Sequence, residues 1–329
     1  MKSLELIQAI EEYNPFCEKI TYSTLFAMML RPEGKFKANF LNVGNAGFGK
    51  TRSTTELQEI LKIPNTVVIN GYVTPFRLFK TLVEHPNDLI ILDEMERTLE
   101  NPQAQFILRS ALYGGEVCWQ SKTNAETYKF NGCLVANLNK LPTKNISSSA
   151  LFDRCFINKL ELNNLQIAEK IRHTRTYDIN KFKPAVRIIK KRILNARFKG
   201  LLELSENEEN EIYEFINDKI INSIEPASVR AIQKTKLVFR CVKTLFEGFD
   251  EKTKRLAFTL AEPQIFQKNQ IDEIINLANL LKNEKKEINY KLLVGEVSKL
   301  KGVSERQARR IINSKPEFIR KNRKLIILK

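Results

Sequence analysis

The residues with the clearest chemical potential are 44–51, which read Gly-Asn-Ala-Gly-Phe-Gly-Lys-Thr. In such a loop the backbone N–H groups curl around phosphate oxygens, the lysine reaches the outer phosphates and the threonine hydroxyl binds Mg²⁺. The glycine spacing does not suit a dinucleotide-binding loop, so a structural glycine-rich turn is the main alternative. The motif predicts a site for a nucleotide and Mg²⁺. Its nucleotide-binding residues would be Gly44, Asn45, Ala46, Gly47, Phe48, Gly49, Lys50, Thr51 and Arg52.

Two adjacent carboxylates follow an apolar run later in the chain. Residues 88–94 read Asp-Leu-Ile-Ile-Leu-Asp-Glu, which is typical of a buried strand that ends in acidic residues. Asp93 would complete the Mg²⁺ shell with Thr51, and Glu94 would polarise an attacking water molecule. An ordinary strand that ends in a polar loop is the alternative.

A polar residue also ends the next apolar run, at 133–136. Asn137 follows this run directly and could orient the attacking water, and Asn139 is the alternative residue for this role. Either side chain could instead cap a turn.

A fourth motif, Leu-Phe-Asp-Arg-Cys-Phe at 151–156, follows these features in order. Together the motifs resemble the AAA+ ATPases over about residues 36–250. The resemblance implies ATP hydrolysis with Mg²⁺ and a homo-oligomer, expected as a hexameric ring. In that family the arginine of this motif enters a neighbouring subunit's site and stabilises transition-state charge, which gives this role to Arg154. A surface ion pair with Asp153 is the alternative.

A shorter match concerns the family's second sensor, an arginine at the start of a lid helix that contacts the γ-phosphate. Residues 226–232 read Pro-Ala-Ser-Val-Arg-Ala-Ile and resemble it, so Arg230 is the candidate.

The elements that must position these residues follow from the hydrophobic pattern. Short apolar runs at 40–43, 66–69, 89–92 and 133–136 have the length of buried parallel strands and are separated by amphipathic stretches. We therefore predict an α/β fold with a parallel sheet, which the resemblance makes a P-loop AAA+ core. The predicted segments are an N-terminal helical segment (1–35), the core (36–160), a helical lid (161–250), a linker (251–268) and a C-terminal domain (269–329). The lid sequence is first basic (170–199) and then acidic (203–214), a pattern that usually marks solvated helix faces.

Residues 116–130 contain two alternating β-prone runs around a Ser-Lys-Thr-Asn turn, which predicts a β-hairpin. A hairpin just before the sensor strand resembles the helicase-like branch of AAA+ proteins, with the minichromosome-maintenance, viral superfamily 3 and RuvB-type motors. There a basic residue at the tip contacts DNA, and Lys122 is the matching position. A structural hairpin with an exposed lysine is the alternative.

The C-terminal domain is predicted to be a winged helix. Amphipathic stretches at 271–282 and 290–300 precede a helix capped by Ser304 and running to 312, and two short strands follow at 318–320 and 324–328. From residue 284 onward, fourteen Lys and Arg stand against five Glu, which favours a DNA contact over a protein contact. The expected DNA-binding residues are Arg306, Gln307, Arg309 and Arg310 on the helix and Arg320, Lys321, Arg323 and Lys324 on the wing.

The composition agrees with a polyanionic partner. The formal net charge of the 329 residues is +16, which favours nucleic acid over a membrane, with a lysine-rich surface for solubility as the alternative. The five cysteines are scattered and there are only two histidines, so neither a zinc site nor a disulfide framework is expected. No apolar run approaches the roughly 18–20 residues of a membrane span, and the N-terminus lacks a signal-peptide pattern, so we expect a cytoplasmic protein.

These features lead to one main hypothesis. The resemblance implies an ATP-hydrolysing DNA motor, a helicase or DNA-remodelling ATPase, which could serve replication of a mobile element or virus. A non-translocating switch, such as a replication initiator, helicase loader or transposition helper, is the first alternative. A protein-remodelling ATPase is the second.

Overall fold

The computed structural model describes residues 2–30, 38–112, 116–120, 125–140, 154–221, 230–264, 287–301, 305–306, 309, 318–321 and 324–327. The chain divides into two compact units, Met1–Gln267 and Lys268–Lys329, and each is described by itself. None of the described helices combines the length and the apolar character needed to cross a bilayer.

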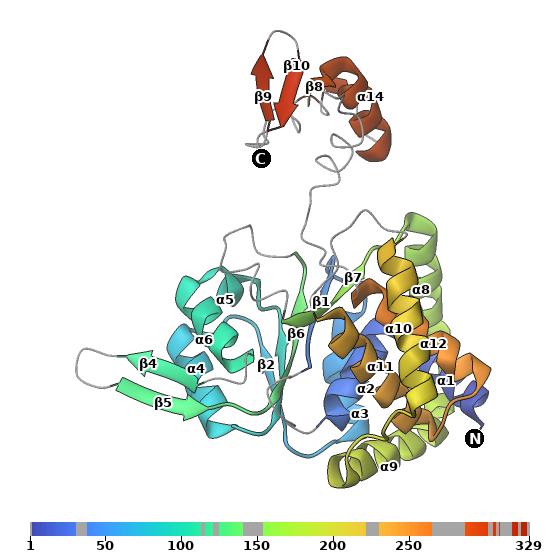
Figure 1. Ribbon diagram of the computed structural model, residues 1–329. Helices are drawn as coiled ribbons and strands as arrows, with labels where there is room; N and C mark the ends of the chain where they lie inside the picture. The colour runs from blue at the N-terminus through green and yellow to red at the C-terminus, as the bar shows by residue number, and fades with distance from the viewer. Residues whose placement is uncertain are drawn as a thin grey trace. The chain divides into compact units, whose positions relative to one another are not determined.

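The first unit is built on a five-stranded parallel sheet (Figure 1). Its strands are β1 (Asn39–Gly44), β2 (Thr66–Asn70), β3 (Leu89–Asp93), β6 (Cys133–Leu138) and β7 (Cys155–Leu160), in the order β2-β3-β6-β1-β7. The α/β fold and the four predicted strands are confirmed. Strand β7 was not predicted, because two consecutive polar residues, Asn158 and Lys159, interrupt its apolar pattern.

Alternating strand residues divide the core between the two faces of the sheet. Phe40, Ile91 and Val135 point into one apolar cluster, and Leu41 and Ile90 point into the other. On the first face, the cluster is completed by helices α1 (Ser3–Tyr13), α2 (Glu18–Met29) and α3 (Leu57–Leu61) and by the helices that follow β7. On the second face, it is completed by α4 (Pro75–Glu84), α5 (Glu96–Glu100) and α6 (Pro102–Leu112) (Figure 1). The N-terminal helical segment is thus part of the core of the first unit.

The segment after β7 consists of helices joined by short non-helical stretches, as predicted for this part of the chain. It contains α8 (Asn164–Thr176), a 3₁₀ turn η2 (Ile179–Phe182), α9 (Lys183–Lys199), α10 (Glu206–Ile221) and α11 (Ala231–Phe246).

The predicted linker at 251–268 is wrong in its first part. It contains α12 (Glu251–Ala261) and a short 3₁₀ turn, η3 (Glu262–Gln264). Asp250 caps this helix by accepting a 2.8 Å hydrogen bond from the Thr253 N–H, and Thr253, Ala257 and Leu260 are buried against α11. These three residues are spaced four and three positions apart, as on one face of a helix. Thr253 and Ala257 add little hydrophobicity, so the sequence pattern indicated this helix only weakly.

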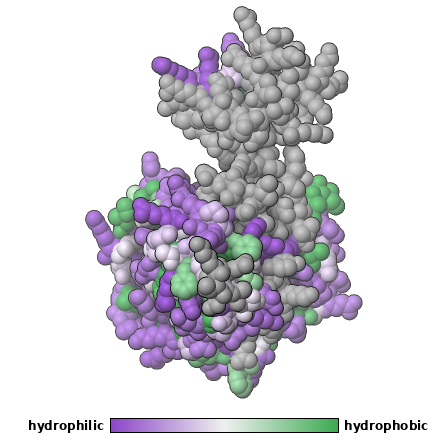
Figure 2. Space-filling view, turned by 90° about the vertical axis from the view of Figure 1, so that its left-hand side faces the viewer, coloured by the Kyte–Doolittle hydropathy of each residue, from purple (hydrophilic) through white to green (hydrophobic). Residues whose placement is uncertain are grey.

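The predicted hairpin is confirmed. Strands β4 (Glu116–Gln120) and β5 (Ala125–Lys129) pair antiparallel, with Glu116 opposite Lys129, and the turn that contains Lys122 lies outside the described residues. The Trp119 ring lies 5.1 Å from Phe76 and 5.8 Å from Phe79, both on α4. Figure 2 views the side on which the hairpin projects and shows small hydrophobic patches in a mainly hydrophilic surface. The aromatic contacts attach strand β4 of the hairpin to α4.

The second unit contains β8 (Glu287–Asn289), α14 (Tyr290–Lys301), β9 (Phe318–Lys321) and β10 (Lys324–Ile327). The strands form an antiparallel sheet in the order β8-β10-β9. The helix at 290–300 and the last two strands are confirmed, whereas β8 was not predicted. The predicted helix at 271–282 lies outside the described residues.

The predicted DNA-binding residues of this unit are described in part. Arg306 and Arg309 are exposed and helical, and Arg309 pairs with Glu305 at 3.3 Å. Arg320 and Lys321 lie on β9, and Lys324 lies opposite Lys321 on β10. Gln307, Arg310 and Arg323 lie outside the described residues.

Candidate functional site

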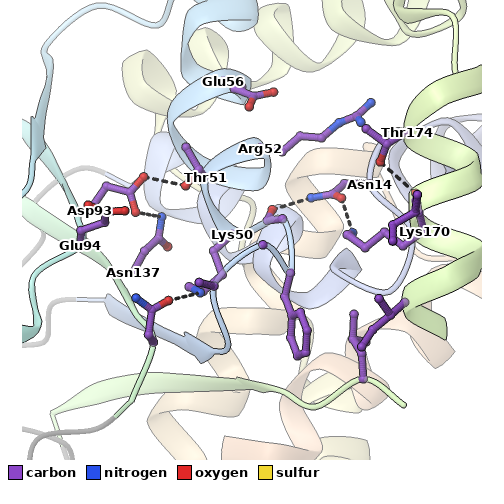
Figure 3. Close-up of a pocket in the computed structure, with 18 of the residues that line it drawn as sticks. Asn14, Lys50, Thr51, Arg52, Glu56, Asp93, Glu94, Asn137, Lys170 and Thr174 are labelled. Carbon is purple, nitrogen blue, oxygen red and sulfur yellow. Dashed lines mark hydrogen bonds between the residues drawn. The ribbon is translucent and has the colours of Figure 1, made fainter. Parts of the chain in front are cut away.

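The carboxyl ends of β3, β6 and β1 lie side by side at one edge of the sheet, where ligands of open α/β sheets bind. A pocket of about 510 Å³ opens there, within the size range of small-molecule sites (Figure 3). Its wall comes from residues 46–52 and 56, from the ends of β3 and β6, from Asn14 and from α8 with the residue Leu162 before it.

The loop 44–51 has the backbone expected of a phosphate cradle. Gly47 and Gly49 have φ angles of +79° and +90°, a left-handed conformation that favours glycine. A Cβ atom on Gly44 would lie 2.7 Å from the carbonyl oxygen of Leu160 on β7, so the loop leaves the sheet where only glycine fits. A helix begins at Lys50 and continues through the π-helical turn η1 (Arg52–Glu56) and α3. Its free N–H groups and dipole favour an anion at this end.

Lys50 lies across the loop. Its Nζ donates to the carbonyl oxygens of Gly44 at 2.6 Å and Asn45 at 3.0 Å, and to Oδ1 of Asn139 at 3.1 Å. These three acceptors are neutral. Burial lowers the pKa of Lys50, and the carboxylates of Glu96 and Asp93 oppose this shift. Phosphate oxygens would supply further negative charge to this cation.

Thr51 and Asp93 come together as predicted. The Thr51 hydroxyl donates to Oδ2 of Asp93 at 2.8 Å (Figure 3). Oδ1 of Asp93 accepts from Nδ2 of Asn137 at 3.1 Å, and the same amide donates to Thr54 at 2.7 Å. This arrangement holds a carboxylate and a hydroxyl together beside the loop, the hard oxygen donors that Mg²⁺ prefers.

A row of asparagines supports Asp93 from within the sheet, and sequence reasoning missed two of its members. Asn158 on β7 donates to Asn42 on β1 at 2.9 Å, and Asn42 donates to Asn137 on β6 at 3.0 Å. The three residues occupy matching register positions on adjacent strands, and all are buried. The available signal was an asparagine in the interior of each of the strands β1 and β7, because a buried amide must find hydrogen-bond partners.

Glu94 and Glu96 both line the pocket. Glu94 is exposed and has a φ angle of +57°, unusual for a residue with a side chain and typical of a constrained functional position. The carboxylate of Glu96 accepts a short hydrogen bond from the backbone N–H of Asn139. Glu96 was missed in the sequence, where its position two residues after Glu94 was the only signal.

The opposite wall is formed by Asn14 and Lys170, which sequence reasoning did not connect with the loop. Lys170 on α8 is buried, and its Nζ donates to Oδ1 of Asn14 at 2.6 Å and to the carbonyl oxygen of Pro15 at 2.7 Å (Figure 3). Asn14 in turn donates to the carbonyl oxygen of Gly49 at 2.8 Å. Burial lowers the pKa of Lys170. The N-terminal segment and α8 are therefore both attached to the loop 44–51.

Arg52 lies between two aromatic rings in the same wall. Its guanidinium carbon is 5.1 Å from the Tyr13 ring centre and 5.3 Å from that of Tyr177. Leu162, Ile167 and Ile171 give this part of the pocket an apolar surface. A planar or apolar part of a ligand would fit here, away from the acidic end.

Arg154 and Arg230 do not line the pocket. Arg154 comes directly before β7, and the pairing of Asn39 with Cys155 and of Gly44 with Leu160 puts it about 20 Å along the strand from the loop, at roughly 3.3 Å per residue. Arg230 precedes α11 by one residue. One turn later, Lys234 donates to the carbonyl oxygen of Cys155 at 2.7 Å, so this end of α11 lies near the start of β7. The geometry does not support a contact of Arg230 with a ligand in its own chain's pocket.

In comparisons with known proteins, no family model matches the chain and no curated protein is significantly similar to it. Within the described part of the chain, no group of three or more His, Cys, Asp and Glu residues could hold a metal ion by itself. A Mg²⁺ ion at Thr51 and Asp93 would therefore complete its shell with phosphate oxygens and water, as is usual for this ion. The left-handed glycines, the helix N-terminus and Lys50 fit a nucleotide that carries such an ion.

Proposed function

We propose that the chain is an ATP-hydrolysing DNA motor of the AAA+ type. The observation that carries the proposal is the convergence of Lys50, Thr51, Asp93 and Glu94 on one pocket at the carboxyl edge of the sheet. The parallel sheet followed by helices supports a P-loop AAA+ core with a helical lid. Helix α14 with the sheet β8-β10-β9 supports a C-terminal winged helix.

The roles of the residues follow from their positions. The loop N–H groups and Lys50 hold the outer phosphates, and Thr51 and Asp93 hold Mg²⁺, which neutralises charge on the phosphate oxygens. Glu94, at the rim of the pocket, orients the attacking water and accepts its proton. The apolar wall with Arg52 holds the nucleoside end.

The two asparagines take different roles. The amide of Asn137 is fully hydrogen-bonded to Asp93, Thr54 and Asn42, so it positions Asp93. Asn139 accepts from Lys50 and is exposed, so it is the residue that faces the γ-phosphate and the water. This assignment favours Asn139 over Asn137 as the polar sensor.

Arg154 lies too far from its own pocket to act there, because an arginine side chain is much shorter than the distance along β7. A second copy of the chain would have to supply it, which supports a ring-shaped homo-oligomer in which Arg154 stabilises transition-state charge in the neighbour's site. The basic second unit and the hairpin β4–β5 are the parts proposed to contact DNA.

The test is ATP hydrolysis by the full chain, alone and with single-stranded, duplex or forked DNA, together with displacement of a labelled strand. Lys50→Ala and Glu94→Gln should each abolish turnover, and Glu100→Gln, at an exposed position of α5 outside the pocket, serves as the matched control. Full turnover in both the Lys50→Ala and Glu94→Gln variants would refute the site. ATPase activity that DNA stimulates without strand displacement would indicate a non-translocating switch, and activity that is indifferent to DNA would indicate a protein-remodelling ATPase.

A further inference from the structure

The helices after the sheet contain a basic segment followed by an acidic segment, and of the charged residues in these two segments only Lys170 and Arg175 line the pocket. Residues 170–199 contain eleven Lys and Arg and a single acidic residue, Asp178. Residues 203–214 contain six Glu and no Lys or Arg. If the two blocks paired with each other, both would be neutralised and neither would imply a partner.

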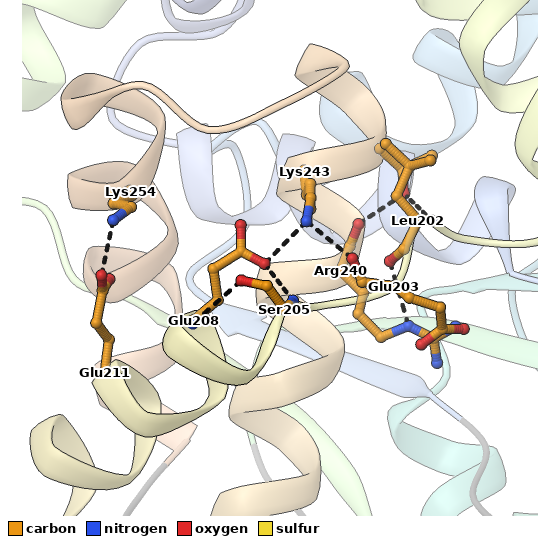
Figure 4. A network of polar contacts seen from close by, with 9 residues as sticks. Leu202, Glu203, Ser205, Glu208, Glu211, Arg240, Lys243 and Lys254 are labelled. Carbon is orange, nitrogen blue, oxygen red and sulfur yellow. Dashed lines mark hydrogen bonds and ion pairs between the residues drawn. The ribbon is translucent and has the colours of Figure 1, made fainter.

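The acidic block pairs elsewhere. Its glutamates contact cations of α11 and α12. Figure 4 shows Glu203 with Arg240 at 2.6 Å, Glu208 with Lys243 at 2.8 Å and Glu211 with Lys254 at 2.8 Å. Glu209 also pairs with Lys236 at 2.7 Å. The basic block is therefore left without the counter-charge that follows it in the sequence.

Helix α9 carries the most regular part of the basic block. Ala185, Ile189, Ile193 and Ala196 form its buried face. Arg192 and Arg197 fix it to the rest of the unit, through the carbonyl oxygens of Leu245 at 2.6 Å and Met28 at 2.6 Å. Of the remaining cations, Lys199 ends the helix, and four lie on the outer face: Lys183, Arg187, Lys190 and Lys191. They form no ion pair with any residue that the structure describes.

The outer face has an aromatic end as well as a basic one. Residues 183, 187, 190, 191, 194 and 198 fall on one side of an α-helix, given its 3.6 residues per turn. The cations extend over about 12 Å, at 1.5 Å per residue, and are followed by Phe198, which is 78% exposed. Cations beside an exposed aromatic ring are the combination that binds the phosphates and stacks the bases of single strands.

We propose that the outer face of α9 is a binding surface for single-stranded nucleic acid, distinct from the nucleotide pocket and from the basic second unit. Lys183, Arg187, Lys190 and Lys191 contact phosphates, and Phe198 stacks on an unpaired base. A membrane surface fits less well, because an interfacial helix presents a broad apolar face and here only Leu194 and Phe198 interrupt the cations.

The experiment is binding of a fluorescent single-stranded oligonucleotide to the full chain over a range of salt concentrations. Two phosphate contacts are removed in Arg187→Ala/Lys191→Ala. This should weaken binding about tenfold at moderate salt and reduce the slope of log K against log salt by about 1.4, at roughly 0.7 per contact for single strands. The matched control, Lys252→Ala/Arg255→Ala, makes the same charge change at exposed positions of α12 and should leave the slope unchanged.

Further variants separate the outcomes. Phe198→Ala should weaken binding of the single strand but not of a duplex, with the salt slope retained. Lys183→Ala/Lys190→Ala repeats the main test at independent positions. Equal losses in the α9 and α12 variants, an unchanged slope in both α9 pairs, or a loss of binding to phosphatidylserine vesicles instead of the oligonucleotide would overturn the proposal. Basal ATP hydrolysis, measured in parallel, reports separately on the proposed nucleotide site.

Discussion

The attachment of Lys170 to the phosphate loop can be tested with two glycine variants. Gly47 and Gly49 both have left-handed φ angles, so alanine strains the backbone at either position. They differ in their surroundings. A Cβ atom on Gly47 would meet no atom within 4 Å, whereas on Gly49 it would lie 2.8 Å from Cε of Lys170 and 3.0 Å from Oδ1 of Asn14.

The backbone strain should cost about 1–2 kcal/mol in either variant. For Gly49→Ala the neighbour must also move. The end of a solvated lysine would move at little cost, but Lys170 is buried and bonded to Asn14 and the carbonyl oxygen of Pro15. Displacing one hydrogen bond to a charged group adds about 1.5–3 kcal/mol. We therefore expect Gly49→Ala to lower the free energy of unfolding by about 1.5–3 kcal/mol more than Gly47→Ala does.

Urea unfolding of the two variants measures this difference directly. In a Lys170→Ala background the contacts with Lys170 are absent and the 3.0 Å approach to Oδ1 of Asn14 remains, so the difference between the two glycine variants should become smaller, which makes the set a double-mutant cycle. A difference of less than about 0.5 kcal/mol in the original background is within the usual scatter of additive effects and would refute the reasoning.

Three further predictions concern the sheet, the buried lysine and the hairpin. Asn42→Leu removes the donor to the Asn137 oxygen and one of the two acceptors of the Asn158 amide, which keeps its bond to Ser23, so urea unfolding should show a loss of about 2–5 kcal/mol; a loss below about 1 kcal/mol would contradict the asparagine row. Burial lowers the pKa of Lys170 below its usual 10.5, so with rising pH the folded state loses this proton before the unfolded state does. The free energy of unfolding of the wild type, measured relative to Lys170→Met, should therefore rise with pH in the alkaline window that ends near 10.5. A pH-independent difference would count against the buried ammonium. Cys118 is exposed while the other four cysteines are buried, so a maleimide should label one thiol rapidly in the native protein, and DNA should slow that reaction if the hairpin binds it; several fast thiols would contradict the burial pattern.

The parts of the fold that the sequence predicts are those in which a local pattern determines the structure. The buried strand β3 is a continuous apolar run, and Asp93 and Glu94 directly follow its apolar residues. In a parallel sheet the carboxyl ends of strands meet at one edge. The proximity of Thr51 and Asp93 could therefore be predicted although 42 positions separate them, and their side chains form a hydrogen bond.

Other features depend on contacts that no local pattern encodes. Lys170 and Asn14 are 156 positions apart, and their hydrogen bond exists because α8 and the N-terminal segment pack on the same side of the loop. The basic residues around Lys170 looked like a solvated face, which is correct for the outer side of α9 and wrong for Lys170 itself. A charge pattern shows that a helix is basic, but it does not show which lysine is buried. The burial of Lys170 depends on which other elements pack over it.

The contacts of the loop also indicate how the pocket and the helices after the sheet are coupled. Asn14 bonds to Gly49 and to Lys170 of α8, and Arg52 lies between Tyr13 and Tyr177, which come before and after the core strands. A shift of the loop would therefore disturb both attachments. Helix α9 follows Tyr177 after one short 3₁₀ turn, and Tyr13 stacks on Phe182 of that turn with ring centres 4.6 Å apart. These contacts form a continuous packed path from Gly49 to the start of α9, so if the loop binds phosphate as proposed, a shift of the loop on binding would be transmitted to that end of the helix.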